Sequence, residues 1–219
     1  MNTKRNNGDE QQPFIPAGHG KESGQYTSKT FYDDFIEREG CTKEELKKLL
    51  TKEEYKAIKK YSNYIYGCAL NKAIREGTCT YENVQTASAI ISAIKKHKLK
   101  GEIKVYRGIT VIEETYIQNF YNKYVNKETI TGSIICSTSR KLKRAIEAIS
   151  TNNENVIGII FETILPKGYE ALPIETIARK KKEKEILINK PFYTIVSIET
   201  GYLNNRMVKR IKIRLQGGK

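Results

Sequence analysis

The sequence predicts an α+β fold, in which a helical layer comes first and a mostly β region follows. Apolar residues recur at helical spacing up to about residue 97, and their period changes to two after Gly101. From there to the C-terminus, β-rich segments alternate with turn residues. Because helices precede strands and do not alternate with them, a parallel βαβ fold is disfavoured.

The domain organisation follows from composition. Residues 1–28 are polar, with Gly, Asn, Gln and two prolines, and predict a flexible arm. Residues 29–219 are expected to form a single domain, with its helical layer at about 42–97 and its mostly β part at about 101–216.

Three helices are predicted in the first layer. The segments TKEE at 42–45 and 51–54 are capping boxes, in which a threonine is followed three residues later by a glutamate. The second box opens a long helix that should end near Gly77, and a third helix is predicted over 82–97. The residues of this third helix expected on one apolar side are Val84, Ala87, Ile91 and Ile94.

The second half is predicted to contain mainly strands. The predicted strands are 102–107, 133–137, 156–165, 183–189, 192–198 and 208–215, and two helices are expected at 113–124 and 141–149.

Charge and composition restrict the classes of partner and binding site that the chain is expected to have. The formal net charge of +14 favours acidic partners such as a nucleic acid, an anionic surface, an acidic protein or a phosphorylated molecule. Four cysteines without regular spacing and two histidines predict no metal site and suggest a reducing compartment. Apolar runs stay below the roughly 20 residues of a membrane span, and the first residues lack the apolar core of a signal peptide. The Gly-rich loops of common nucleotide-binding folds are also missing.

Three polar groups stand out on the predicted strands. Arg107 continues the face of Ile103 and Val105, so it points inward. A buried guanidinium needs an anionic partner, which is either a core carboxylate or a bound phosphate. Residues 137–139 read Ser-Thr-Ser at a strand end, where Ser139 either caps the next helix or the hydroxyls support a nearby charge.

The third group is Glu183 with Glu185, which alternate with lysine where a loop enters an apolar strand. Residues two apart share a strand face, so both carboxylates lie side by side. A solvated strand edge is one interpretation. Acid–base chemistry, or stabilisation of a glycosyl cation, is the other.

In their order, the Arg107 strand, the Ser-Thr-Ser segment and the Glu-x-Glu pair resemble the bacterial mono-ADP-ribosyltransferase exoenzymes. Within that family, the chain is similar to the catalytic components of clostridial actin-modifying binary toxins and to the Rho-modifying exoenzymes. The resemblance covers about residues 42–215 and includes the tyrosine-rich helix LTKEEYKAIKKYSNYIYGCALNKAIREG. It implies two packed, roughly perpendicular β-sheets under an N-terminal helical layer, with NAD as a substrate in the cleft and no metal.

The resemblance also implies roles for individual residues. Arg107 is expected to hold the NAD phosphates, and the backbone of Gly108 to touch the nicotinamide amide. Ser137 is expected to orient Glu185, the catalytic glutamate, which binds the 2′-hydroxyl of the nicotinamide ribose. Glu183 is expected to prepare the acceptor, and a glutamate at that position implies an arginine acceptor.

Further NAD contacts are implied on the strand end and the long helix. Thr138 and Ser139 are expected to hold the cleft open, and Asn71 to face the dinucleotide. Tyr66 takes the place of the family's helix tyrosine, shifted by one position. Arg140 and Arg144 are candidates for a second phosphate-binding arginine, and the usual aromatic before the first glutamate is replaced by lysine.

The resulting hypothesis is an NAD-dependent mono-ADP-ribosyltransferase that acts as a secreted or delivered toxin in a host cytosol. Its partners are NAD and an acidic host protein, such as an actin-like protein or a small GTPase, with a separate delivery component as an option. Two alternatives remain at this point. One is an NAD glycohydrolase, in which water replaces the protein acceptor, and the other is a basic module that binds single-stranded nucleic acid. The second gives no reason for two acids on one strand face.

Overall fold

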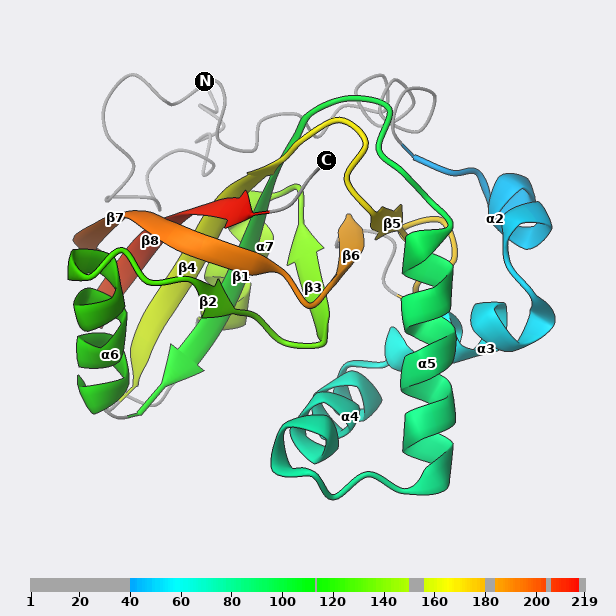
Figure 1. Cartoon of the computed structure of the whole chain (residues 1–219), viewed down its shortest axis with the longest axis horizontal. Helices are drawn as coiled ribbons and strands as arrows, with labels where there is room; N and C mark the ends of the chain where they lie inside the picture. Colours follow the sequence, from blue (N-terminus) through cyan, green and yellow to red (C-terminus); the bar gives the residue numbers. More distant parts are fainter. Residues whose placement is uncertain (1–39, 113, 150–155, 180–183, 204–205, 217–219) are drawn as a thin grey trace, which may run out of the picture.

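The computed structural model describes residues 40–112, 114–149, 156–179, 184–203 and 206–216. The arm predicted at residues 1–28 lies outside the described residues. As predicted, helices come first and strands dominate later (Figure 1). The helices are α2 (Lys43–Leu49), α3 (Lys52–Tyr61), α4 (Tyr64–Glu76), α5 (Tyr81–Lys95), α6 (Glu114–Val125) and α7 (Leu142–Ile149).

Both predicted capping boxes are confirmed. The Thr42 side chain accepts a hydrogen bond from the Glu45 N–H at 3.1 Å, and the Glu45 carboxylate accepts one from the Thr42 N–H at 2.7 Å. Thr51 and Glu54 repeat the arrangement at the start of α3. These bonds satisfy backbone donors that the first turn of a helix leaves unpaired.

The prediction of one long helix up to Gly77 was wrong, because the chain breaks between α3 and α4. The Asn63 side chain accepts hydrogen bonds from the Ile65 and Tyr66 N–H groups at 3.1 and 3.5 Å, which starts a new helix. A short polar side chain competes with the helix for its own backbone donors in this way. Gly77 does end α4, with the left-handed φ of +68° that a glycine cap adopts readily.

The apolar side predicted for α5 needs a correction. Its buried residues are Thr86, Ala87, Ile90, Ala93 and Ile94, whereas Val84 is 51% exposed. The buried side faces α3, α4 and β5, so packing selects a stripe centred on Ile90 over the one centred on Val84 and Ile91.

The strands agree with the prediction except at their ends and in two short additions. They are β1 (Ile103–Val111), β2 (Ile130–Thr131), β3 (Ile135–Ser139), β4 (Ile157–Leu165), β5 (Ala171–Pro173), β6 (Glu185–Asn189), β7 (Phe192–Leu203) and β8 (Arg206–Gln216). The missed strands β2 and β5 are two and three residues long, which is too short for an alternating pattern to emerge.

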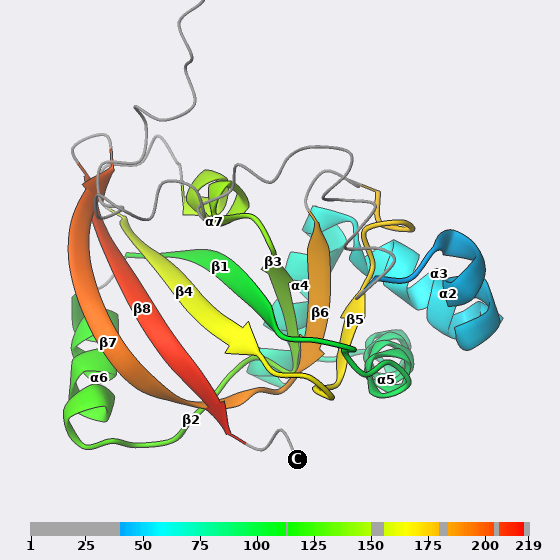
Figure 2. The same cartoon turned by 90° about the horizontal axis from the view of Figure 1, so that it is seen from above.

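The strands form one sheet in the order β2-β7-β8-β4-β1-β3-β6-β5. Its two halves are joined where β1 meets β3, through the residue pair Tyr106 and Ser139. Figure 2 shows β7, β8 and β4 running in a different direction from β3, β6 and β5, on the two sides of this joint. We call these the β7 half (β2, β7, β8, β4 and β1) and the β6 half (β3, β6 and β5).

Each half has its own helical cover. Helices α3, α4 and α5 pack with Ile135, Leu172 and Leu187 of the β6 half into one core cluster. Helix α6 packs on the β7 half, where Phe120 meets Ile159 and Tyr193 in a second cluster. The polar groups of interest lie near the joint, between these two cores.

Candidate functional site

The site is centred on Glu185, the first residue of β6. Its carboxylate accepts a hydrogen bond from the Ser137 hydroxyl at 2.5 Å. In the antiparallel register, Ser139 lies opposite Glu185 and Ser137 lies opposite Leu187, so all of these side chains share one face of the β6 half. Glu185 is 8% exposed, and this pair lies on the side of the sheet that packs against α3 to α5.

Arg107 reaches the same region from β1, across the joint. Its Nη1 donates to the Ser137 carbonyl at 3.1 Å and to the Cys136 sulfur at 3.2 Å. Cys136 beside it raises the pKa of the guanidinium above its ordinary range, while burial acts in the opposite direction. Among the described residues, the hydrogen-bond partners of Arg107 are thus a sulfur and a carbonyl oxygen, and neither is a carboxylate. The structural ion pair considered from the sequence is therefore not formed among the described residues.

Tyr61, at the end of α3, is a buried residue of the helical layer on which the charges of this region act. The Asn71 amide of α4 donates to the Tyr61 hydroxyl at 2.9 Å. Burial raises the pKa of Tyr61 well above its ordinary value, and the charges of Arg107 and Glu185 also act on it. Tyr61 was not among the residues predicted from the sequence to belong to the site. In one continuous helix, residues ten apart are separated by about 15 Å along the axis, and the break between α3 and α4 brings them together.

Tyr66 takes a different position from Tyr61. Its hydroxyl donates to the Thr86 hydroxyl of α5 at 3.4 Å, and its ring lies 4.3 Å from the Lys60 ammonium. It is therefore part of the packing between α3, α4 and α5, and it does not line the cavity described next.

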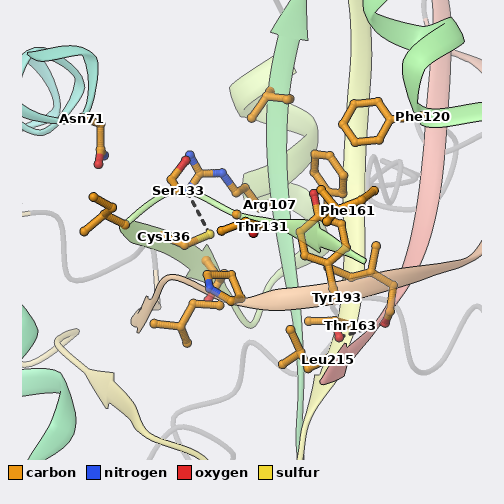
Figure 3. Close-up of a pocket in the computed structure, with 18 of the residues that line it drawn as sticks. Asn71, Arg107, Phe120, Thr131, Ser133, Cys136, Phe161, Thr163, Tyr193 and Leu215 are labelled. Carbon is orange, nitrogen blue, oxygen red and sulfur yellow. Dashed lines mark hydrogen bonds between the residues drawn. The ribbon is translucent and has the colours of Figure 1, made fainter. Parts of the chain in front are cut away.

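A cavity of about 960 Å³ runs from α4 across β1 to α6. Figure 3 shows Asn71, Arg107 and Cys136 at one end, with Phe120, Phe161 and Tyr193 grouped at the other. Arg75, one turn after Asn71 on α4, also lines it and was not singled out from the sequence. The Ser137 and Glu185 side chains are not part of this lining. They lie beside it, because Arg107 lines the cavity and its guanidinium donates to the Ser137 carbonyl.

The remaining hydroxyls of the Ser-Thr-Ser segment bond to the backbone. Thr138 donates to the Ile186 carbonyl at 2.9 Å from the opposite face of β3, where it also lines the cavity. Ser139 accepts from the Lys141 N–H at 3.0 Å, just before α7 begins. Both bonds fix the end of β3 next to Ser137.

Gly108 lies where α7 crosses β1. A Cβ atom there would stand 2.1 Å from the Ala145 carbonyl oxygen, so the close approach of the helix requires glycine. The packing of α7 on β1 is therefore sufficient to explain the glycine at position 108. The contact with nicotinamide that the resemblance implies is not needed to explain it.

The other charged residues that were singled out from the sequence and that the structure describes do not line the cavity. Glu183 lies outside the described residues. Arg140 makes a buried ion pair with Glu175 at 3.1 Å, and Arg144 pairs with Glu147 on the surface of α7. Neither arginine lines the cavity, whereas Arg75 does.

Two further observations concern the part of the chain that the structure describes. No group of three or more His, Cys, Asp or Glu side chains there is arranged to hold a metal ion. No helix among those residues combines the length and apolar character needed to cross a bilayer.

Sheet order, helical layer and the Ser137–Glu185 pair together define an ADP-ribosyltransferase-like α+β domain. Residues 40–216 match the ADP-ribosyltransferase exoenzyme family, and the chain belongs to that family. A relative, the NAD(+)–arginine ADP-ribosyltransferase EFV from Enterococcus faecalis, is 29% identical over 155 residues, or 68% of this chain. The match spans 30% of that relative's length.

Solved structures share the fold. Plx2a, an ADP-ribosyltransferase toxin from Paenibacillus larvae, has a TM-score of 0.66 at 18% identity, covering 84% of this chain and 94% of its own. The ADP-ribosylating toxin BECa of C. perfringens, solved with NADH, has a TM-score of 0.59 at 20% identity, over 84% and 47%. The C3 exoenzyme from Clostridium limosum has a TM-score of 0.57 at 15% identity, over 84% and 92%.

Proposed function

We propose that this chain transfers ADP-ribose from NAD to a protein side chain, most simply an arginine, and releases nicotinamide. The observation that carries the proposal is the Ser137–Glu185 hydrogen bond of 2.5 Å, next to a cationic Arg107 whose described partners are a thiol and a carbonyl. A fixed carboxylate and an available guanidinium suit a reaction in which a diphosphate is held while positive charge develops on a sugar.

In this reaction the bond between C1′ of the ribose and the nicotinamide nitrogen breaks. Its electron pair leaves with nicotinamide as a neutral pyridine, and an oxocarbenium-like ribose remains. Glu185 binds the ribose 2′-hydroxyl and stabilises this positive charge, because the nearly buried carboxylate is already oriented by Ser137. The acceptor nitrogen then attacks C1′, and its proton passes to a base, the role assigned to Glu183.

The cavity supplies the binding interactions for NAD. Arg107 and Arg75 both line it, so two cations face the two negative charges of the pyrophosphate. Asn71 and Thr138 lie on the same lining, while Gly108 follows Arg107 on β1 and Ser139 follows Thr138 on β3. We assign the helix tyrosine role to Tyr61, because its hydroxyl accepts from the Asn71 amide, whereas the Tyr66 hydroxyl donates to Thr86.

The acceptor and its protein are the finer part of the proposal. A glutamate at position 183 and the E. faecalis relative, whose name specifies arginine, both favour an arginine acceptor. The net charge of +14 favours an acidic host protein, with an actin-like protein or a small GTPase as the first candidates. Several structural neighbours are toxins, which supports a delivered toxin or effector that acts in a host cytosol, with or without a separate delivery component. Residues 29–219 then form the transferase domain, preceded by the arm at 1–28.

The test is incubation with labelled NAD, with and without host lysate, while nicotinamide release and labelled protein are followed in parallel. Glu185→Gln should abolish both readouts, and Glu170→Gln, at an exposed glutamate, should change neither. Glu183→Gln should abolish transfer to arginine and retain some hydrolysis. Free ADP-ribose without labelled protein would identify an NAD glycohydrolase. Absence of nicotinamide release at high enzyme concentration would contradict the proposal.

A further inference from the structure

Three charged side chains surround the strand ends that carry the Ser137–Glu185 pair. Arg140 follows Ser139, Lys184 precedes Glu185, and Glu175 lies in the segment after β5. The Arg140 Nη2 is 3.2 and 3.1 Å from the two Glu175 oxygens, and the Lys184 Nζ is 3.4 Å from one of them. We call these three residues the Glu175 cluster. The Glu175 side chain is 1% exposed, and those of its partners are 7% and 14% exposed.

Backbone hydrogen bonds connect the segments that carry these charges to the backbone next to Glu185. The Arg140 N–H donates to the Lys184 carbonyl at 3.3 Å, and the Ile174 N–H donates to the Glu185 carbonyl at 3.0 Å. The ends of β3, β5 and β6 therefore meet at one point. The Glu175 carboxylate binds side chains from two of these ends, while its own segment binds the backbone of Glu185.

The segment that carries Glu175 is itself fixed to the helical layer. The Thr176 hydroxyl donates to the Cys41 carbonyl at 3.0 Å, and the Arg179 N–H donates to the Ser62 hydroxyl at 3.2 Å. The Ile177 and Ala178 N–H groups donate to the Ile174 carbonyl at 3.0 and 2.8 Å, which closes the turn that contains Glu175. Glu175 therefore lies between the Ile174 hydrogen bond to β6 and the two anchors at Thr176 and Arg179, so its carboxylate can hold Arg140 and Lys184 without moving toward them.

The backbone of Lys184, just before β6, adopts a conformation that is unfavourable for a residue with a side chain. Its φ is +52°, a left-handed conformation that costs an L-residue about 1 kcal/mol or more. The ion pair with Glu175 is one contact that offsets this cost at Lys184. Burial lowers the pKa of the Lys184 ammonium, and the Glu175 carboxylate is the chief influence in the opposite direction. The ion pair therefore stabilises both the charge and the backbone turn that immediately precede Glu185.

We propose that the Glu175 cluster is a positioning device for Glu185: it fixes the first residue of β6 so that the carboxylate stays directed at Ser137 and the ribose. The consequence for catalysis rests on the function proposed above. Because one buried anion serves two cations, loss of Glu175 leaves two like charges together, which costs several kcal/mol. Loss of Lys184 removes one cation and leaves the Arg140–Glu175 pair intact, so it separates positioning from folding.

Lys184→Gly is the informative variant. Glycine adopts the left-handed φ without strain, which offsets the lost ion pair, so the melting temperature should remain close to that of the wild type. The kcat for nicotinamide release should fall about ten- to a hundredfold, the range that a displacement of a catalytic group by up to 1 Å produces, while KM for NAD is unchanged. Lys184→Arg, which keeps the cation, should restore kcat. Glu175→Gln should lower kcat and the melting temperature together.

Lys127→Gly is the matched control. Lys127 follows α6, is exposed, and has a φ of +54°, so the substitution removes the same charge at the same kind of backbone position. Its kcat should equal that of the wild type. Wild-type kcat in Lys184→Gly, or an equal fall in Lys127→Gly, would overturn the proposal.

Amide hydrogen exchange supplies a readout that needs no activity. The Arg140 and Ile174 amides should exchange faster in Lys184→Gly than in the wild type, and should be unaffected in Lys127→Gly. If the wild type releases no nicotinamide, the proposed function is wrong. Amide exchange then still tests whether the Glu175 cluster fixes the start of β6. Unchanged exchange at both amides would then show that the cluster does not hold this corner.

Discussion

Replacement of Ser137 by alanine tests how much the Ser137–Glu185 contact contributes to catalysis. The hydroxyl donates to the carboxylate at 2.5 Å, within the range of a charge-assisted O–H···O⁻ hydrogen bond. A hydrogen bond to a charged group contributes about 1.5–3 kcal/mol. If the full contribution acts on the oriented carboxylate in the transition state, kcat falls about 10- to 150-fold, since each ~1.4 kcal/mol is a factor of ten. Glu185 also loses a donor while it is nearly buried, so the melting temperature should drop by several degrees.

Ser92→Ala is the control for that loss of stability. The Ser92 hydroxyl donates to the Glu54 carboxylate at 2.7 Å, which is again a serine bonded to a buried glutamate, but within the packing of α5 on α3. Nicotinamide release should be measured at saturating NAD, well below both melting temperatures. Ser92→Ala should lose stability and keep the wild-type kcat. The reasoning is refuted if Ser137→Ala keeps the wild-type kcat, or if both variants lose it equally.

Three further predictions use other contacts. Arg107→Lys should raise KM for NAD in initial-rate measurements, because an ammonium replaces the planar fork, and an unchanged KM would exclude Arg107 as a phosphate ligand. Gly108→Ala should lower the free energy of unfolding in urea by about 1–3 kcal/mol, because its Cβ would lie 2.1 Å from the Ala145 carbonyl, and unaltered stability would contradict the packing reason. Burial raises the pKa of Cys41 from 9.0 to about 11. Its stabilising contribution is therefore complete below pH 9 and lost as the pH rises toward 11, so Cys41→Ala should flatten the alkaline decline in stability over that interval, and an identical decline would refute this assignment.

Local signals in the sequence predicted the fold best. The capping boxes at Thr42 and Thr51 are complete within four residues, so their outcome depends little on the rest of the chain. The break at Asn63 was missed because the apolar spacing of the long helix continues through it, and only the side-chain cap reveals it. The joint between β1 and β3 has no signature in either strand, because pairing between distant segments is decided by tertiary packing.

The structure brings together some of the residues that were singled out from the sequence. The resemblance implied that Ser137 orients Glu185, and the structure places the two in contact across neighbouring strands. Tyr61 and Arg75 were not found, since their positions depend on the angle between α3 and α4 and on which side of α4 faces the cavity. For Arg107 the inward direction was correct, but its described partners are a thiol and a carbonyl, which periodicity alone does not predict.

The partners of Arg107 also explain how a site assembled from two half-sheets keeps its shape. Tyr106, the residue before Arg107, makes the pairing with Ser139 that joins β1 to β3, and the Arg107 side chain adds hydrogen bonds to Cys136 and Ser137 across the same joint. The guanidinium that is assigned to the NAD phosphates therefore also fastens the β7 half to the strand that bears Ser137. A dinucleotide bound to Arg107 would occupy the joint, and its binding energy would stabilise the placement of Glu185 relative to the cavity. Under the proposed function, NAD binding and the orientation of the Glu185 carboxylate would be coupled through Arg107, because this side chain both lines the cavity and contacts Ser137.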